Sequence, residues 1–316
     1  MTKLWLAVVV VVAVAAFALF LARPPAHDER IRVGYRPLVL ALPLYVALDE
    51  GFFASEGLDV EAVKLGSPAL IVNGLVAGSL DASANVAWLT LLSAESRGGG
   101  MLVHAAQLDC SDQPISFILV RSDSPFTSVS ELSGKRVALE PGNAYTRFLL
   151  DRLAEKYGVS NWSLVPMETQ LQLTALQAGS VDAVFALEPT ATVGETMGVA
   201  RVLLSGPQPQ VMGDVAVGGP FLLSQKFVAS RPDAAYRYSR AIDRAISFIE
   251  ANESRARETL PKYTGVADEL ARKVRLPRYW NSTGLNAGLM QSQADVFASN
   301  GLIDQPVNVS QLVYRA

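Results

Sequence analysis

The chain has 316 residues, of which 50% are hydrophobic and 18% charged, with a formal net charge of -3 and a single cysteine. This length is enough for one large domain or for two lobes of about 150 residues each. A mildly acidic chain without a basic stripe binds nucleic acid poorly, so no nucleic-acid partner is expected. A single cysteine excludes an intrachain disulfide framework.

The first 26 residues form a segment of their own, because residues 4–22 carry no charge and are mostly aliphatic. An apolar run of about 18 or more residues can span a bilayer, whereas the core of a signal peptide has about 7–15. Cleavage after Ala16-Phe17-Ala18 would still fit the small-x-small rule. The segment is therefore either an uncleaved signal anchor, forming an N-terminal hydrophobic helix, or a cleaved secretory signal. Both predict that the remainder is exported to the periplasm or another extracytoplasmic compartment.

Two nearly identical nonapeptides, LVAGSLDAS at 75–83 and LQAGSVDAV at 176–184, share six positions and lie 101 residues apart. Each ends the second helix of a pattern that reads strand, helix, strand, helix, strand. The expected elements are 31–35, 43–55, 58–63, 68–77 and 80–86 in one unit, and 135–140, 144–157, 162–167, 168–178 and 181–187 in the other. Alternating strands and helices of these lengths predict a parallel sheet with right-handed crossovers. The repeat therefore predicts two similar α/β lobes.

The remaining segments connect the two lobes. Residues 104–123 contain two strand-like runs that lead out of the first lobe, and the glycine-rich residues 213–224 lead back. After them the pattern becomes mostly helical, as in residues 231–252. We therefore assign 27–112 and 220–316 to lobe 1 and 113–219 to lobe 2, each a mostly parallel sheet flanked by helices.

Four segments resemble a known family: PLYVALDEGFFASEGLDVEAV, GLVAGSLDAS, ELSGKRVALEPGNAYTRFLLDRLAEKYGV and ALQAGSVDAVFALEP. They are similar to the nitrate/sulfonate/taurine-type solute-binding proteins of ABC importers, a family that also includes binders of thiamine-pyrimidine precursors. The resemblance covers about residues 32–249. It implies a type II periplasmic-binding-protein-like clamshell that closes around a sulfonate- or taurine-like, or an aminopyrimidine-like, solute. It also implies an ABC permease as partner, with the chain acting as a monomer.

The solute site is expected beyond the carboxyl ends of the parallel strands, where helix N-termini and loops converge. This rule selects Tyr35, Arg36, Ser67, Asn85 and Trp88 in lobe 1, and Gly142, Asn143, Ala144, Tyr145, Thr146 and Glu188 in lobe 2. Ser67 and Asn143 open helices whose free N–H groups suit an oxyanion. Ser67 fits a plain helix cap equally well, whereas the resembling family uses the turn at 143–146 for its ligand.

Aromatic and charged side chains complete the candidate site. Tyr45 and Trp88 could stack on a planar or apolar group of the solute, although Tyr45 also fits a core position. Arg36 could pair with an anionic solute or remain a solvated surface residue. The acidic residues expected around the cleft are Asp109, Asp112, Glu140 and Glu188. Free carboxylates would suit an ammonium or an aminopyrimidine and would repel nitrate, although acidic residues before helices are also ordinary.

Catalytic patterns are missing from the sequence, which has no GxSxG, P-loop, HExxH or GxGxxG-after-strand motif. One cysteine and two histidines are too few for an ordinary zinc site, and His104 in an apolar run fits a core position. No catalytic residue, metal or cofactor is therefore expected. Two alternatives remain: an enzyme on the same fold with Asp112 or Glu188 as acid or base, and an extracellular sensor with a separate membrane partner.

Overall fold

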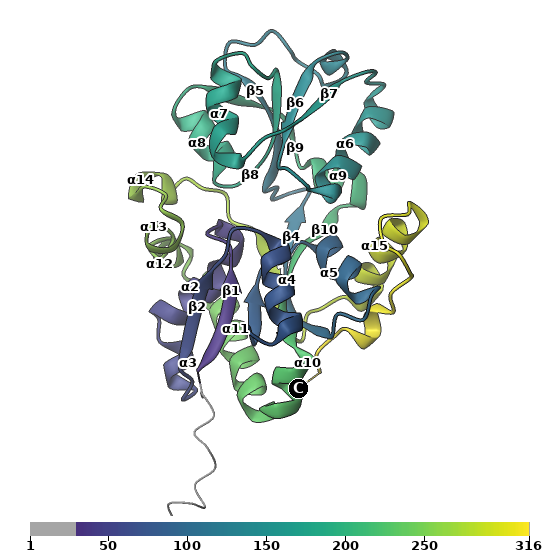
Figure 1. Cartoon of the computed structure of the whole chain (residues 1–316). Coiled ribbons are helices and arrows are strands. Elements are labelled where there is room, and N and C mark those ends of the chain that lie inside the picture. The colour runs from purple at the N-terminus through teal and green to yellow at the C-terminus, as the bar shows by residue number, and fades with distance from the viewer. Residues whose placement is uncertain (1–29, 316) are drawn as a thin grey trace, which may run out of the picture.

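The structure, a computed structural model, describes residues 30–315 as two lobes built on two separate sheets (Figure 1). The segment predicted as a signal or anchor, residues 1–26, lies outside the described residues. Among residues 30–315, no helix is both long enough and apolar enough to cross a bilayer.

Lobe 1 contains a six-stranded mixed sheet. Its strands are β1 (Ile31–Tyr35), β2 (Val60–Lys64), β3 (Ala82–Ala84), β4 (Met101–Cys110), β10 (Val215–Ser224) and β11 (Arg278–Trp280), in the order β11-β4-β10-β3-β1-β2. Its helices are α2 (Leu42–Asp49), α3 (Phe52–Ser55), α4 (Pro68–Ala77), α5 (Trp88–Glu95), α10 (Gln225–Ser230), α11 (Pro232–Ala251), α12 (Glu253–Arg257), α13 (Leu260–Thr264), α14 (Asp268–Ala271) and α15 (Ala287–Ser299).

Lobe 2 contains a five-stranded mixed sheet. Its strands are β5 (Ser116–Arg121), β6 (Arg136–Leu139), β7 (Ser163–Pro166), β8 (Ala183–Leu187) and β9 (Ala200–Ser205), in the order β7-β6-β8-β5-β9. Its helices are α6 (Ala144–Tyr157), α7 (Thr169–Gln177), α8 (Thr190–Thr196) and α9 (Pro207–Met212). The boundaries given above for the two lobes remain a prediction.

The two predicted β-α-β-α-β units are present, one in each lobe. β1 pairs in parallel with β2 and β3, and β6 pairs in parallel with β7 and β8. The prediction that each sheet is mostly parallel was wrong, because β4, β10 and β11 in lobe 1, and β5 and β9 in lobe 2, add antiparallel pairs. None of these antiparallel pairs joins strands that are consecutive in the chain, and β4 pairs with β10 only after the chain has passed through lobe 2. The crossover rule that makes the β-α-β units parallel therefore does not apply to them.

One predicted helix is divided in two. Residues 43–55 were expected as a single helix, but α2 ends at Asp49 and α3 starts at Phe52. Gly51 between them has a φ of 69°, in the left-handed region that ends a helix. The other helices of the two repeated units agree closely, with α4 and α6 at the predicted residues and α7 within one residue at each end.

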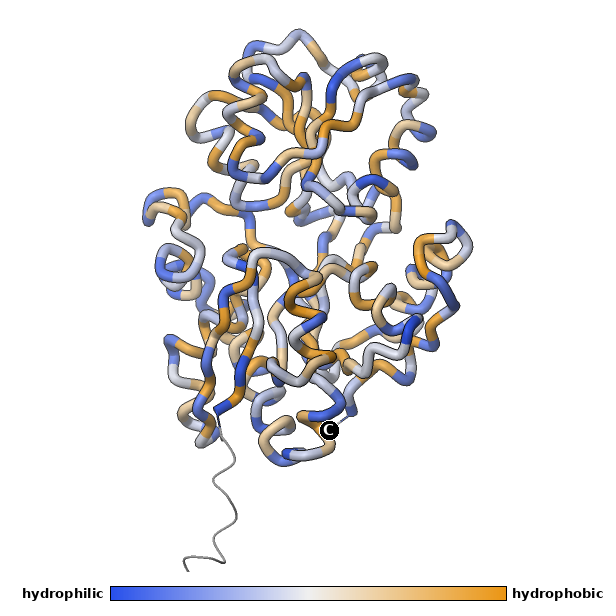
Figure 2. Tube along the Cα trace, in the orientation of Figure 1, coloured by the Kyte–Doolittle hydropathy of each residue, from blue (hydrophilic) through white to orange (hydrophobic). Residues whose placement is uncertain are grey.

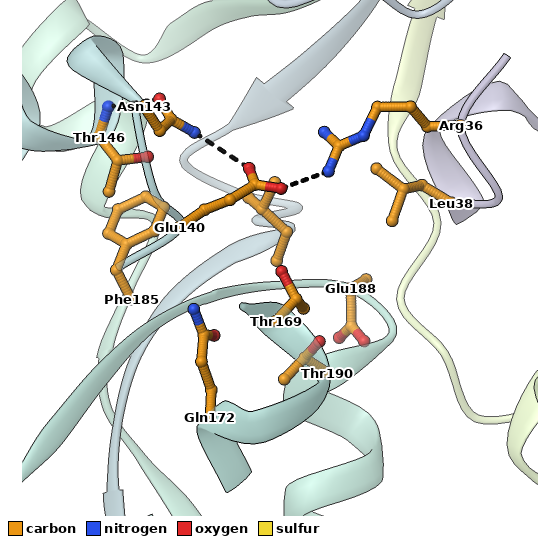
Figure 3. A pocket seen from close by; sticks show the side chains of 11 residues that line it. Arg36, Leu38, Glu140, Asn143, Thr146, Thr169, Gln172, Phe185, Glu188 and Thr190 are labelled. Atoms are coloured by element: carbon orange, nitrogen blue, oxygen red, sulfur yellow. Dashed lines mark hydrogen bonds and ion pairs between the residues drawn. The ribbon is translucent and has the colours of Figure 1, made fainter. Parts of the chain in front are cut away.

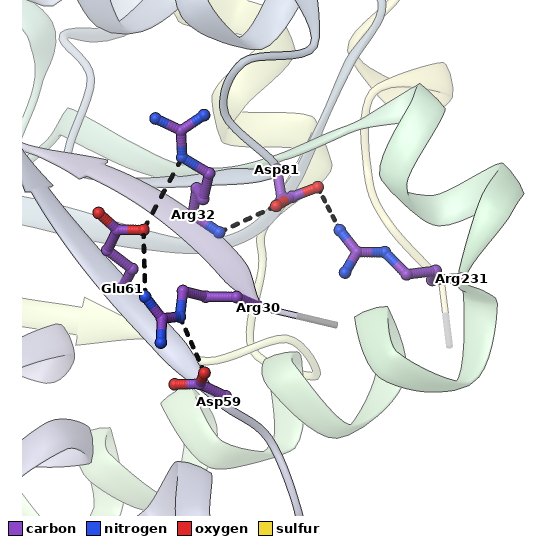
Figure 4. Close-up of polar contacts among 6 residues, drawn as sticks. All are labelled: Arg30, Arg32, Asp59, Glu61, Asp81 and Arg231. Carbon is purple, nitrogen blue, oxygen red and sulfur yellow. Dashed lines mark hydrogen bonds and ion pairs between the residues drawn. The ribbon is translucent and has the colours of Figure 1, made fainter. Parts of the chain in front are cut away.

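The repeated nonapeptide has the same structural role in both lobes. In the first copy, the carboxylate of Asp81 accepts a hydrogen bond from the backbone N–H of Arg32 at 2.9 Å, and the N–H of Asp81 donates to the carbonyl of Arg32 at 2.9 Å (Figure 4). In the second copy, Asp182 makes the same two bonds with Arg136, both at 2.8 Å. The aspartate that both copies of the repeat share thus bonds the start of the third strand in each unit to the first strand.

Hydrophobic residues concentrate along the strands of both sheets, and polar residues concentrate on the outer helices (Figure 2). One buried cluster continues from lobe 1 into lobe 2. Within it, Phe297 of α15 packs edge-on against Tyr145 and Phe148 of α6, with ring centroids 5.6 and 6.0 Å apart. The lobes are therefore in direct apolar contact beside the strands β4 and β10 that connect them.

Candidate functional site

A cavity of about 500 Å³ lies between the two lobes. Lobe 1 lines it with residues such as Arg36, Ser67 and Asn85, and lobe 2 with residues such as Asn143 and Phe185. A smaller hollow of about 40 Å³ adjoins it and shares several of its lining side chains (Figure 3). The combined volume suits a small organic molecule, and both lobes would contact it.

Three helices begin at the wall of the large cavity. Ser67 caps α4 by accepting a hydrogen bond from the N–H of Leu70 at 3.4 Å, and Asn143 caps α6 by accepting from the N–H of Thr146 at 3.0 Å. α5 begins at Trp88 and lines the cavity through Leu89 and Thr90. The first N–H groups of a helix have no intrahelical partner, so these ends make the wall favourable for hydrogen-bond acceptors.

An ion pair crosses the cavity from one lobe to the other. Arg36 Nη2 donates to Glu140 Oε1 at 2.5 Å, and the other oxygen of Glu140 accepts from Asn143 Nδ2 at 3.3 Å (Figure 3). The Arg36 side chain is 18% exposed and that of Glu140 28% exposed, so the pair is partly shielded from water.

A second ionic contact between the lobes surrounds Glu188, which is fully buried. Arg275 donates to Glu188 at 3.0 Å and to Glu195 at 2.8 Å, while its guanidinium lies over the ring of Phe117. Burial raises the pKa of Glu188, and hydrogen bonds from Arg275 and Thr192 oppose that rise. Glu188 is therefore held by the protein's own cation.

Every ionised side chain that lines either hollow is paired with another residue. Besides the pairs at Arg36 and Glu188, Arg97 at the rim pairs with Asp304 at 3.0 Å. Asp109 is buried outside the cavity and accepts from Ser116 and from the N–H of Ile115. The sequence analysis expected free carboxylates that would repel an anion, but the carboxylates that line the hollows, Glu140 and Glu188, are both paired with arginines. The argument against an anionic solute therefore no longer holds. Among residues 30–315, no group of three or more His, Cys, Asp or Glu could hold a metal ion.

Nine of the thirteen residues proposed from the sequence line the hollows. They are Arg36, Ser67, Asn85, Gly142, Asn143, Ala144, Tyr145, Thr146 and Glu188. Their positions follow from the rule used to select them, since each lies just after a parallel strand or at the start of the following helix.

The structure places four proposed residues away from both hollows. Tyr35 and Trp88 are buried in the core, and Tyr45 donates its hydroxyl proton to backbone carbonyls while its ring stacks on Tyr263. Asp112 lies on the surface and pairs with Arg278 at 2.8 Å. The proposed aromatic stacking by Tyr45 and Trp88 is thus not available in this conformation.

A model of the family described as NMT1/THI5 like matches residues 41–256, more than half of the chain. The chain belongs to the NMT1/THI5-like family. Three curated relatives are similar to the chain. A putative thiamine biosynthesis protein of Haemophilus influenzae is 26% identical over 85% of each chain, and the putative binding protein YtlA of Bacillus subtilis is 23% identical over 67% of this chain and 64% of its own. A 4-amino-5-hydroxymethyl-2-methylpyrimidine phosphate synthase of Aspergillus parasiticus is 23% identical over 68% of this chain and 65% of its own. For the last two relatives, the chain spans slightly less than two thirds of the relative's length.

Solved structures of other proteins share the fold. The aliphatic sulphonate binding protein SsuA of Escherichia coli matches with a TM-score of 0.75 at 19% identity, over 92% of this chain and 93% of that one. The nitrate-binding protein NrtA of Synechocystis matches with a TM-score of 0.71 at 18% identity, over 90% and 85%. The predicted family and the periplasmic-binding-protein fold are thereby confirmed.

This NMT1/THI5-like chain also lines its cavity with residues that the sequence analysis missed. They include Gln107, Gln208, Thr169, Gln172, Phe185 and Leu187. Gln107 had a sequence signal, because it is an amide within the otherwise largely apolar strand MLVHAAQLDC. Phe185 and Leu187 had none, since apolar residues in a strand usually indicate core.

Proposed function

We propose that this chain is an exported solute-binding protein that captures a small organic solute between its lobes and delivers it to an ABC permease. The observation that carries the proposal is the cavity of about 500 Å³, which both lobes line and across which Arg36 and Glu140 meet. Closure around a solute would bury it and change the outer shape of the molecule, which a permease can recognise. Family membership and the shared fold with SsuA and NrtA support this role.

The solute is proposed to be sulfonate- or taurine-like, or aminopyrimidine-like. The helix N-termini at Ser67 and Asn143 support an acceptor group such as a sulfonate. Similarity to a putative thiamine biosynthesis protein and to a pyrimidine phosphate synthase supports the aminopyrimidine class.

The similarity to a synthase also keeps an enzymatic role as the second candidate. Its two proposed acid–base residues are poorly placed for it, because Glu188 is bound by Arg275 and Asp112 lies outside the cavity. Recovery of a chemically altered compound after incubation with an aminopyrimidine would favour the enzyme over the binding protein.

A thermal-shift screen tests the proposal directly. The full chain, freed of bound compounds by unfolding and refolding, would be heated with alkanesulfonates, taurine, nitrate and aminopyrimidines. A solute at about 100 times its dissociation constant adds about 2.7 kcal/mol, which raises the melting temperature by several degrees. A flat response across the whole panel would contradict the proposal.

A further inference from the structure

A buried pair of amides in the lobe 1 wall of the cavity has hydrogen-bonding capacity that the protein does not use. Asn85 follows β3 and Gln107 lies on β4, and both line the large cavity. Asn85 Nδ2 donates to Gln107 Oε1 at 3.3 Å and to the carbonyl of Gly219 at 3.5 Å. Gln107 is 1% exposed, yet its Nε2 has no hydrogen-bond partner within the part of the chain that the structure describes.

The carbonyl of Gly219 determines which atoms of the pair remain free. A carbonyl can only accept, so it requires the Nδ2 side of Asn85 to face it. The same Nδ2 requires the oxygen side of Gln107, which leaves the Gln107 NH2 as the unused donor. Asn85 Oδ1 likewise receives no hydrogen bond from residues 30–315. The amide pair therefore offers one donor and one acceptor.

The wall is shaped around this pair. A Cβ atom on Gly218 would lie 2.4 Å from Gln107 Oε1, and one on Gly219 would lie 2.4 Å from Asn85 Nδ2. Asn85 itself has a φ of 63°, in the left-handed region, which asparagine adopts more readily than most residues other than glycine. Such backbone conformations concentrate at binding sites, where the surroundings hold them in place.

The charges around the cavity favour a neutral solute group at this wall. The ionised lining side chains already form the pairs Arg36–Glu140, Arg97–Asp304 and Glu188–Arg275. A solute that brought a full charge to the amide pair would meet no unpaired counter-ion there, and its desolvation would be poorly compensated. A neutral group with its own donor and acceptor would satisfy both free atoms.

We propose that the Asn85–Gln107 pair determines specificity by recognising an uncharged solute edge that carries an acceptor beside a donor, as in amides, lactams and amino-heterocycles. The inference rests on the proposed solute-binding function and narrows its solute class. A sulfonate offers only acceptors, so it would leave Asn85 Oδ1 facing a negative group. The N–H groups at the N-termini of α4 and α6 would then donate hydrogen bonds to acceptor atoms on another part of the solute.

Calorimetry on the full chain tests this proposal with four probes: nicotinamide and 4-amino-2-methylpyrimidine as neutral edges, and propane-1-sulfonate and taurine as sulfonates. Gln107→Glu replaces the free donor by an acceptor of the same shape. Gly218→Ala displaces the Gln107 amide without changing any charge, and the fold should tolerate it because the atom it meets is the end of a flexible side chain. We expect both variants to bind the neutral probes at least about tenfold more weakly than the wild type, since a buried polar group is left unpaired.

Two variants serve as controls. Gln177→Glu makes the same chemical change on the exposed end of α7, and Gly66→Ala adds a Cβ that would meet nothing within 4 Å. Both should bind the neutral probes within about twofold of the wild type, and melting temperatures should show that all four variants are folded.

The outcomes separate this inference from the function on which it rests. If sulfonates bind more tightly than the neutral probes, or if Gln107→Glu and Gly218→Ala bind neutral probes like the controls, the inference is overturned and the solute-binding function stands. If no probe of either class binds, the solute-binding function fails and the inference fails with it.

Discussion

Arg36 and Glu140 occupy equivalent positions in the two lobes, and their side chains meet across the cavity at 2.5 Å. Arg36 directly follows β1 and Glu140 directly follows β6, the first strand of each repeated unit. The duplication therefore places opposite charges at matching points of the two lobes. Because one partner comes from each lobe, the pair stabilises the arrangement in which the lobes approach one another.

Glu140→Gln should shift the solute-free protein towards a more open arrangement of the lobes. A partly shielded hydrogen bond between charged groups contributes about 1–2 kcal/mol, enough to change the ratio of open to closed molecules about tenfold. Small-angle scattering would detect this as a larger radius of gyration. The control is Asp59→Asn, which removes a partner of Arg30 within lobe 1 (Figure 4). Equal scattering from the two variants would argue against a closing role for the pair.

Arg275→Met should destabilise the protein more at pH 7 than at pH 5. Without Arg275, Glu188 keeps a buried charge whose pKa, already raised by burial, would rise further. The folded-state pKa then lies above the unfolded one, so stability is lost as the pH rises between the two values. We expect a loss of about 2–3 kcal/mol at neutral pH, less than for a fully buried pair because the Arg275 side chain is 38% exposed.

Urea unfolding at the two pH values measures the effect of this change. Lys273→Met is the matched control. Lys273 lies two residues before Arg275 in the chain, and the change removes a cation from an exposed pair with Glu269. An equal loss at both pH values would show that Arg275 acts through packing on Phe117 and not through the charge of Glu188.

Asp109→Asn should flatten the dependence of stability on pH. Burial raises the pKa of Asp109 to about 6 from an ordinary 3.8, although hydrogen bonds from Ser116 and Ile115 oppose the rise. The folded protein therefore binds the proton more tightly, and stability falls as the pH rises from about 4 to about 6, by about 3 kcal/mol from this group. Denaturant unfolding between pH 4 and 7 should show a smaller fall in the variant. Asp112→Asn, at an exposed neighbouring position, should retain the fall seen in the wild type.

The sequence was sufficient to predict the parallel units, because hydrophobic periodicity and helix-ending glycines are local signals. The repeated Asp81 and Asp182 identified the duplication, and their paired backbone hydrogen bonds give its physical reason. The antiparallel strands were harder to place, because nothing local in β4 or β10 specifies which strand will pair with it.

The site was predictable only in part, for the same reason. Arg36 and Asn143 could be placed at the cavity because the ends of parallel strands and the starts of the following helices meet at one edge of a sheet. Which charged groups pair across the lobes depends on tertiary contact, so the neutralisation of Glu188 by Arg275, 87 residues away in the chain, could not be foreseen. Trp88 follows a strand like the other candidates, and only packing shows that its side chain faces the core.

The cap of α6 offers a way to separate stability from binding at the cavity. Asn143→Ala removes the acceptor for the N–H of Thr146 at 3.0 Å and should cost about 1 kcal/mol. Asn286→Ala removes the same kind of cap from α15, where Asn286 accepts from the N–H of Leu289 at 3.0 Å, and Asn286 lies outside both hollows. Urea unfolding should therefore give similar losses for the two variants.

Binding should distinguish these two cap variants. Asn143 also lines the cavity and donates to Glu140, so Asn143→Ala changes the wall that a solute would contact, whereas Asn286→Ala does not. We expect Asn143→Ala alone to weaken the binding of whichever probe the thermal-shift screen identifies, by about tenfold for one lost hydrogen bond to a polar solute. Equal affinities in the two variants would mean that α6 contributes its cap to folding and that the solute lies against the other wall of the cavity.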